Sequence, residues 1–202
     1  MLGDGAPQAA TTIVLAREPG MSSMPMPLHR YLMTGVVLCV AAVSLPQRAR
    51  AVGDVAVARL KLADGTEAGT VTLMEATAGV LMKFELKGLK PGPHGLHVHE
   101  SGACDGDFSS AGAIYNPLGA KHGYLHDEGP MAGDLPNIHA GADGTASGEF
   151  LSPFLTLSKD AEETLFDADG ASLVLFENPD DYASDPEGNT GNRVACGTIT
   201  AK

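Results

Sequence analysis

Two histidines separated by one residue, His97 and His99, are the clearest candidates for chemistry in the sequence. Apolar and polar residues alternate from His94 to His99, which predicts a strand with both imidazoles on one face and Leu96 and Val98 on the other. Imidazole nitrogen is a good ligand for both copper and zinc. The pair therefore predicts part of a metal site carried by a rigid strand.

More candidate ligands, His122, His126 and Asp134, follow within residues 100–142, a stretch rich in Gly, Pro, Asp and Asn. Loops of this length in a compact domain are usually functional, so the chemistry is expected there. A carboxylate beside imidazoles is common at zinc sites, and the pattern admits either copper or zinc. Histidines in polar loops are also ordinary surface residues, and we interpret His126 and His139 as solvent-exposed or supporting residues.

The elements that must position these residues are short strands. Alternation of apolar residues on both sides of the turn Asp64-Gly65 predicts a β-hairpin, and the 25 Gly residues of the chain suit tight turns. A second polar loop is predicted at residues 177–192, before the final strand. The predicted strands, which together indicate an all-β domain, span residues 55–62, 70–74, 80–86, 94–99, 145–150, 172–176 and 194–200.

The N-terminal part of the chain has the pattern of a signal peptide. An apolar run, Tyr31–Leu45, is shorter than a comfortable membrane span and precedes the small-x-small sequence Ala49-Arg50-Ala51. We expect cleavage after Ala51, so that residues 1–51 are an N-terminal extension plus signal peptide and residues 52–202 are a periplasmic or secreted domain without stable membrane insertion. An uncleaved membrane anchor is the alternative. The candidate translation starts are Met1, Met21, Met24 and Met26.

The cysteines fit an exported protein. Cleavage would remove Cys39 and leave Cys104 and Cys196. An even pair in an oxidising compartment favours a disulfide, and two buried free thiols are the alternative.

The charge of the chain restricts its partners. The formal net charge is −12 at pH 7, and residues 52–202 carry a still larger acidic excess. This excludes nucleic acid as a partner and would repel a small anionic substrate unless a local positive group overcame the field.

Longer motifs make the pattern specific. They are HGLHVHE at 94–100, SAGAIYNP at 110–117, KHG at 121–123, GDLPN at 133–137, PDD at 179–181 and NRVACG at 192–197. In this order and spacing, across residues 55–200, the chain resembles the bacterial periplasmic copper/zinc superoxide dismutases. The resemblance implies a Greek-key β-sandwich or flattened barrel, two long functional loops, a disulfide joining Cys104 to Cys196, and neighbouring copper and zinc sites.

The resemblance also assigns expected roles to the metal-site residues. His97 and His99 match two copper ligands of the family, whereas His122 and Asp134 match zinc ligands.

Residues around those ligands match the family as well. Asp180 matches an aspartate that hydrogen-bonds one ligand of each metal, which here would be His97 and His122, and His94 is expected to support the ligands in the same way. Arg193 matches the arginine that attracts superoxide beside the copper, although a role in salt bridges and loop packing is an almost equal alternative.

Three ligand positions depart from the family pattern. Ile114 stands where the family has the imidazolate that bridges the two metals, Met131 stands at a zinc histidine, and Phe176 stands at the last copper histidine. Ile and Phe have no donor atom, and the Met thioether binds Cu(I) well but zinc poorly. In the family the bridging imidazole leaves and regains copper as copper changes oxidation state, which Ile114 cannot do.

The leading hypothesis is therefore a metal binder with degenerate sites and little or no ordinary dismutase activity. One copper or zinc ion, rather than two, would be held by His97 and His99, with Met131 or with His122 and Asp134 as further ligands.

Two alternatives remain open at this point. The chain could be an active dismutase, with copper completed by water and His126, and with Arg193 guiding superoxide. It could also be a metal-free structural or interaction module, in which Ile114 and Phe176 fill the vacated site.

Overall fold

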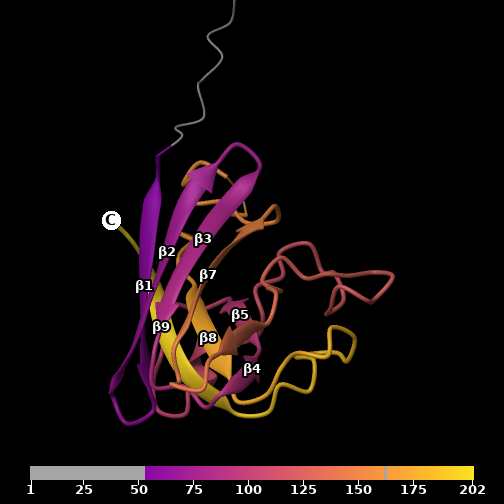
Figure 1. Ribbon diagram of the computed structural model, residues 1–202. Helices are drawn as coiled ribbons and strands as arrows, with labels where there is room; N and C mark the ends of the chain where they lie inside the picture. The colour runs from indigo at the N-terminus through magenta and orange to yellow at the C-terminus, as the bar shows by residue number, and fades with distance from the viewer. Residues whose placement is uncertain (1–52, 162) are drawn as a thin grey trace, which may run out of the picture. The chain divides into compact units, whose positions relative to one another are not determined.

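The computed structural model describes residues 53–161 and 163–202 (Figure 1). The predicted N-terminal extension, signal peptide and cleavage site lie outside these residues. Within them, no helix is both long and apolar enough to cross a bilayer. The elements are β1 (Val55–Leu62), β2 (Glu67–Ala76), β3 (Gly79–Leu86), β4 (Gly92–His94), β5 (Leu96–His99), the short 3-10 helix η1 (Ser109–Ala111), β6 (Ile138–Ala140), β7 (Ala146–Ser152), β8 (Ser172–Phe176) and β9 (Arg193–Ala201).

Seven of the strands form one antiparallel sheet in the order β5-β8-β9-β1-β2-β3-β7, and β4 and β6 form a small second sheet. The large sheet curls strongly, as Figure 1 shows, so that its two faces become the inside and outside of a flattened barrel. The chain crosses from one side of the sheet to the other after β3, after β5 and after β7, as in a Greek key. The predicted all-β fold class is confirmed.

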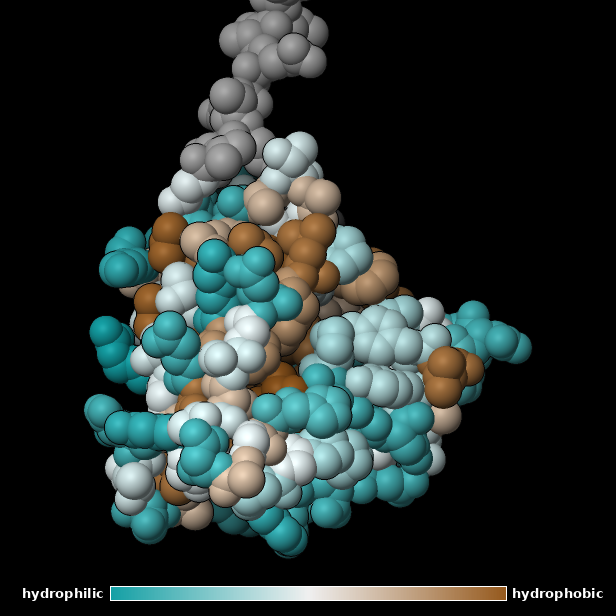
Figure 2. Space-filling view, viewed as in Figure 1, coloured by the Kyte–Doolittle hydropathy of each residue, from teal (hydrophilic) through white to brown (hydrophobic). Residues whose placement is uncertain are grey.

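Alternation along the strands explains the core. Leu60 in β1, Leu73 in β2 and Met82 in β3 are fully buried because successive side chains of a strand point to opposite faces of the sheet. The segment after β7 adds Leu157 and Leu165 to the same apolar cluster. The face of the molecule seen in Figure 2 is mainly hydrophilic, in keeping with the net charge of −12.

The strand predicted at residues 94–99 is interrupted. Gly95 separates β4 from β5, and both its backbone groups are used elsewhere, because its N–H donates to Asn178 O (2.9 Å) and its carbonyl accepts from Phe176 N (2.9 Å). Strand β6 was also missed within the predicted loop at 100–142. It contains only three residues, too few to show periodicity, and it forms through pairing with β4.

Three connections are long, at residues 100–137 before β6, 153–171 before β8 and 177–192 before β9. Residues 100–137, the first loop, and residues 177–192, the second loop, extend from the same side of the barrel in Figure 1. Strand β5 lies at the end of the sheet, and the first loop covers its outer edge. Val98 N–H donates to Gly133 O (2.9 Å) and Val98 O accepts from Tyr115 N–H (2.9 Å).

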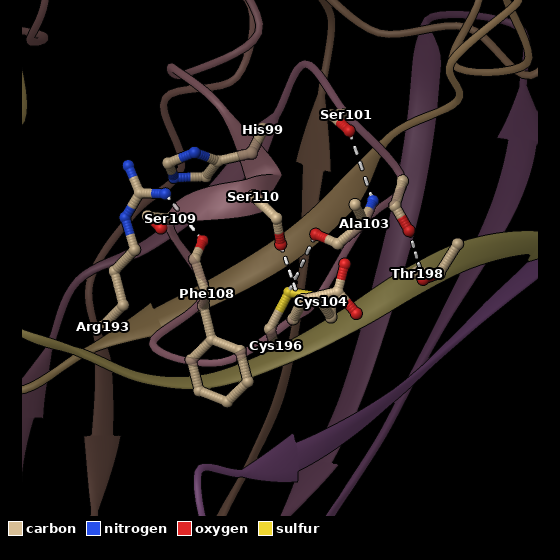
Figure 3. Close-up of a disulfide and its surroundings, with 12 residues drawn as sticks. His99, Ser101, Ala103, Cys104, Phe108, Ser109, Ser110, Arg193, Cys196 and Thr198 are labelled. Carbon is tan, nitrogen blue, oxygen red and sulfur yellow. Dashed lines mark hydrogen bonds between the residues drawn. A yellow bond between two sulfur atoms is a disulfide. The ribbon is translucent and has the colours of Figure 1, made fainter.

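The implied disulfide is confirmed. Cys104 in the first loop is bonded to Cys196 in β9, with their Cα atoms 5.7 Å apart (Figure 3). The bond fixes the start of this loop to β9, the strand that also carries Arg193.

Candidate metal site

The two histidines of β5 each have one ring nitrogen in a hydrogen bond and one without a partner. His97 Nε2 donates to Asp180 Oδ2 (2.9 Å), and His99 Nδ1 donates to Gly112 O (3.0 Å), because carboxylate and carbonyl oxygens only accept. His97 Nδ1 and His99 Nε2 are buried and have no hydrogen-bond partner among the described residues. Both side chains are 0% exposed.

His99 is held in its neutral form. Burial lowers the pKa of His99 to about 3, outweighing the hydrogen bond to the Gly112 carbonyl, and the positive charge of Arg193 acts in the same direction as burial. With Nδ1 donating, the lone pair of a neutral ring lies on Nε2, which is the unpartnered atom. His99 therefore presents a metal-ligand nitrogen at neutral pH.

His122 is in the opposite state, because both its ring nitrogens contact carboxylates. Nδ1 donates to Asp134 Oδ1 (2.8 Å) and Nε2 donates to Asp180 Oδ1 (3.0 Å). Burial alone would lower the pKa of His122, but the two carboxylates more than offset burial and raise it to about 10. A proton thus joins His122 to Asp134, the two residues that match zinc ligands.

The two carboxylates are also satisfied by other donors. Asp134 Oδ2 accepts from the N–H groups of Gly123 (2.8 Å) and Met131 (2.9 Å). Burial would raise the pKa of Asp180, but hydrogen bonds from His122 and His97 outweigh it, and the pKa is well below its usual range. Only glycine fits at position 188, where φ is +61° and a Cβ would overlap Asp180 Oδ1.

The ligand atoms of His97, His122 and Asp134 lie within 4.8 Å of one another, so the expected ligands from β5 and the first loop do come together. A metal ion bound by this group would have to displace a proton from His122. By contrast, His99 Nε2 carries a free lone pair, and His97 Nδ1 has no hydrogen bond to give up. The residues present thus fit copper at His97 and His99, whereas the hydrogen bonds of His122 and Asp134 are satisfied without an ion.

The three substituted positions lie against the remaining candidates. The Phe176 ring is fully buried, with its centroid 5.1 Å from that of His97 and 5.8 Å from that of His99. Ile114 is 3% exposed and forms a β-bridge with His99. Met131 is partly buried and meets Asp134 through its backbone N–H.

Arg193 at the start of β9 is held by three neighbouring residues. Nη1 donates to Phe108 O (2.9 Å), and Nη2 donates to Gly112 O (2.9 Å) and to Glu187 Oε1 (2.7 Å). Its guanidinium carbon lies 6.0 Å from the centre of the Phe176 ring. Figure 3 shows the guanidinium beside His99 and the Phe108 carbonyl. Glu187 was not predicted, because no sequence pattern distinguishes it from the other acidic residues of its polar loop.

The remaining predicted histidines lie around this centre. His94 contacts two carbonyl oxygens, with Nδ1 2.7 Å from Phe176 O and Nε2 2.7 Å from Lys90 O, and so supports the backbone of the Phe176 position. His126 Nδ1 accepts from Glu128 N–H (3.1 Å), and His139 is exposed on β6. Neither His126 nor His139 belongs to the cluster of candidate ligands found among the described residues.

The opposite pKa shifts of His99 and His122 predict a stability optimum for the metal-free protein near pH 6.5. The contribution of His122 to the free energy of unfolding is fully present below its unfolded pKa of 6.5 and is lost as pH rises toward 10. The contribution of His99 is present above pH 6.5 and is lost as pH falls toward 3. Each limb should slope by up to about 1.4 kcal/mol per pH unit.

Urea unfolding of chelator-treated protein between pH 4 and 9.5 measures both limbs of this profile. Replacement of His122 by glutamine should flatten the alkaline limb only. A parent protein with constant stability from pH 6.5 to 9 would contradict the assignment of a shared proton to His122.

Comparison with known proteins shows what the chain is similar to. The sequence profile of the family described as copper/zinc superoxide dismutase (SODC) matches residues 67–199. The superoxide dismutase [Cu-Zn] of Caulobacter vibrioides is 49% identical over 147 residues, which cover 71% of this chain and 84% of that protein. The copper chaperone for superoxide dismutase of Rattus norvegicus is 38% identical over 142 residues, covering 67% of this chain and 49% of the chaperone.

A solved structure gives the same result for the fold. The crystal structure of a SOD-like protein from Bacillus subtilis superposes with a TM-score of 0.69 at 34% identity, covering 71% of this chain and 97% of that one. Profile, sequence identity and fold therefore agree, and the chain belongs to the copper/zinc superoxide dismutase family.

Proposed function

We propose that this protein is an exported copper binder of the family that holds a single Cu(I) ion through His97 Nδ1 and His99 Nε2 and has little or no ordinary dismutase activity. The observation that carries the proposal is the pair of buried imidazole nitrogens without partners. An unsatisfied buried polar atom costs about 1 to 3 kcal/mol, so two on neighbouring side chains of one strand need a reason. A bound metal ion supplies that reason, because imidazole nitrogen is a good ligand for copper.

The donor set favours Cu(I) over Cu(II) and zinc. Two neutral imidazoles suffice for Cu(I), whereas Cu(II) prefers four donors in a tetragonal arrangement and structural zinc prefers four in a tetrahedral one. His122, Asp134 and Asp180 satisfy one another through shared protons, which supports one ion rather than two.

Three features of the site argue against ordinary dismutation. Ile114 has no nitrogen to bridge two metals, and Phe176 packs where a further imidazole would complete the copper set. The charge of Arg193 is paired with Glu187 at 2.7 Å, which weakens its attraction for a superoxide anion. The chain keeps the fold of a dismutase, while Ile114 supplies no bridging imidazole and Arg193 is paired with Glu187.

Export to the periplasm or beyond the cell is part of the same proposal. The apolar run Tyr31–Leu45 and the following Ala49-Arg50-Ala51 support a cleaved signal peptide. The disulfide between Cys104 and Cys196 supports an oxidising compartment.

The test is metal binding by the chelator-treated protein, offered Cu(I) under anaerobic conditions, Cu(II) and Zn(II) separately. We expect one equivalent of Cu(I) to bind in competition with a chromophoric chelator. The double variant His97→Gln/His99→Gln should lose more than about 100-fold in affinity, since even supporting residues change metal affinity by about 10- to 100-fold. The control His139→Gln, at an exposed histidine of β6, should bind as the parent does. Parent protein that takes up no Cu(I), or a double variant that binds equally well, would refute the proposal.

A metal-free interaction module is the second candidate, and one observation favours it. The Phe176 ring packs against both imidazoles, with centroid distances of 5.1 and 5.8 Å, and could take the place of an ion by filling the site. In that case, no metal should bind stoichiometrically, and Phe176→Ala should destabilise the protein by about 3 to 5 kcal/mol without creating a metal site.

A further inference from the structure

The unpartnered nitrogens of His97 and His99 have no open route to solvent, because both side chains are 0% exposed. Phe176 packs against both rings, and the guanidinium of Arg193 lies 6.0 Å from the Phe176 ring centre. An ion or reagent can therefore reach the two nitrogens only when residues packed around them move. Among these residues, we call Phe176 and Arg193 the cover of the site.

Arg193 connects the cover to the first loop, residues 100–137, and to the second loop, residues 177–192. Its bonds to Phe108 O and Gly112 O hold the first loop, whereas its ion pair with Glu187 holds the second. Gly112 O also accepts the hydrogen bond of His99, so the first loop and the donor pair are linked directly. The Glu187 side chain has Arg193 as its only hydrogen-bonding or ionic partner among the described residues.

We propose that Glu187 is the latch of this site: through its ion pair with Arg193 it keeps the cover over His97 and His99 closed and thereby sets the rate at which a metal ion enters and leaves. The proposal rests on the proposed function, since it names the residue that controls access to the same donor pair. Glu187 is a positioning residue that acts through Arg193.

The size of the effect follows from the burial of the ion pair. The side chains of Arg193 and Glu187 are 16% and 31% exposed, so the pair is partly shielded from water. Losing such a pair should increase the population of the open cover about fivefold, the upper end for pairs near a surface. Glu187→Gln keeps the size and loses the charge, whereas Glu187→Ala also loses the contact and should have the larger effect.

The first measurement uses metal-free protein, so it does not depend on copper binding. Diethyl pyrocarbonate acylates unprotonated imidazole nitrogen, and mass spectrometry of peptides gives a rate for each histidine. Acylation of His99 should be about fivefold faster in Glu187→Gln than in the parent, while acylation of exposed His139 serves as an internal reference and stays constant. The matched control is Glu149→Gln, which breaks an exposed ion pair with Lys83 (3.1 Å) on the barrel. Equal His99 rates in parent and Glu187→Gln would overturn the latch.

The second measurement separates a latch from simple attraction of a cation by a carboxylate. With Cu(I) as the probe, a latch predicts that association and dissociation rates both rise about fivefold in Glu187→Gln, while their ratio, the Kd, changes little. Electrostatic attraction alone predicts slower association, faster dissociation and a weaker Kd, and that result would overturn the latch.

A double-variant cycle tests whether Glu187 acts through Arg193. Arg193→Gln should accelerate His99 acylation at least as much as Glu187→Gln, and the double variant should be no faster than Arg193→Gln alone. Additive effects would show that Glu187 acts independently of Arg193 and would contradict the proposal. A parent protein that binds no Cu(I) would refute the proposed function, whereas the acylation rates test the latch separately.

Discussion

Replacement of Asp180 by alanine is expected to lower the free energy of unfolding of the metal-free protein by about 3 to 5 kcal/mol, the loss typical of removing one partner of a buried charged pair. Asp180 accepts hydrogen bonds from His97 Nε2 (2.9 Å) and His122 Nε2 (3.0 Å), and all three side chains are buried. Without it, the positive charge of His122 would keep a single carboxylate partner, and His97 would lose its one hydrogen bond.

The neighbouring residue provides the control for this variant. Asp181 is exposed and accepts hydrogen bonds from Ser184 and Asn189 at the surface, so Asp181→Ala should cost much less. Asp180→Asn should be intermediate, because an amide can bond only one of the two imidazoles through its oxygen. Urea unfolding at pH 6.5 compares the three variants. Equal losses for Asp180→Ala and Asp181→Ala would mean that the buried network contributes little to stability.

Restoring the three missing histidines together should restore dismutase activity. In the triple variant Ile114→His/Met131→His/Phe176→His, the donor set of both family sites would be complete. We expect superoxide removal by copper- and zinc-loaded protein to exceed that of the loaded parent by about 100-fold or more, the range that one positioned proton donor contributes. The positions suit this change, because Ile114 pairs with the His99 backbone, Met131 adjoins Asp134 and Phe176 packs against His97.

The single and double variants show which position limits activity. Phe176→His alone adds a copper ligand without a bridge, and Ile114→His alone adds a bridge without the last copper ligand, so each should give only a small part of the gain. Free copper at equal concentration is the blank. A triple variant that binds both metals but remains as slow as the parent would show that the loss of activity has another cause, for which the Arg193–Glu187 pair is the next candidate.

The fold was predictable wherever a segment shows its own periodicity. Strands β1 and β8 were predicted with their observed bounds, β1 from alternating apolar residues and β8 from a short apolar run that is buried along its whole length. The break at Gly95 and the short strand β6 were not predictable in this way. Both depend on backbone partners far along the chain, Asn178 for Gly95 and β4 for β6.

The candidate site divides in the same way. The resemblance named its residues and the hydrogen bonds of Asp180 to His97 and His122, and both bonds are present. It did not indicate the protonation of His122, which depends also on the bond from Nδ1 to Asp134, 12 positions away, a contact that no local pattern encodes. Glu187 was missed for the same reason, since its importance comes only from the Arg193 side chain that the fold places beside it.

The covered edge of β5 has a consequence for aggregation. A strand at the end of a sheet offers unpaired backbone groups that another chain can extend by strand addition. Here the first long loop occupies that edge, since Val98 bonds to Gly133 and Tyr115. The loop that supplies His122 and Asp134 therefore also protects the sheet from intermolecular pairing. Any change that detaches this loop would expose the unpaired backbone groups of β5. Solubility and the integrity of the site therefore depend on the same backbone hydrogen bonds.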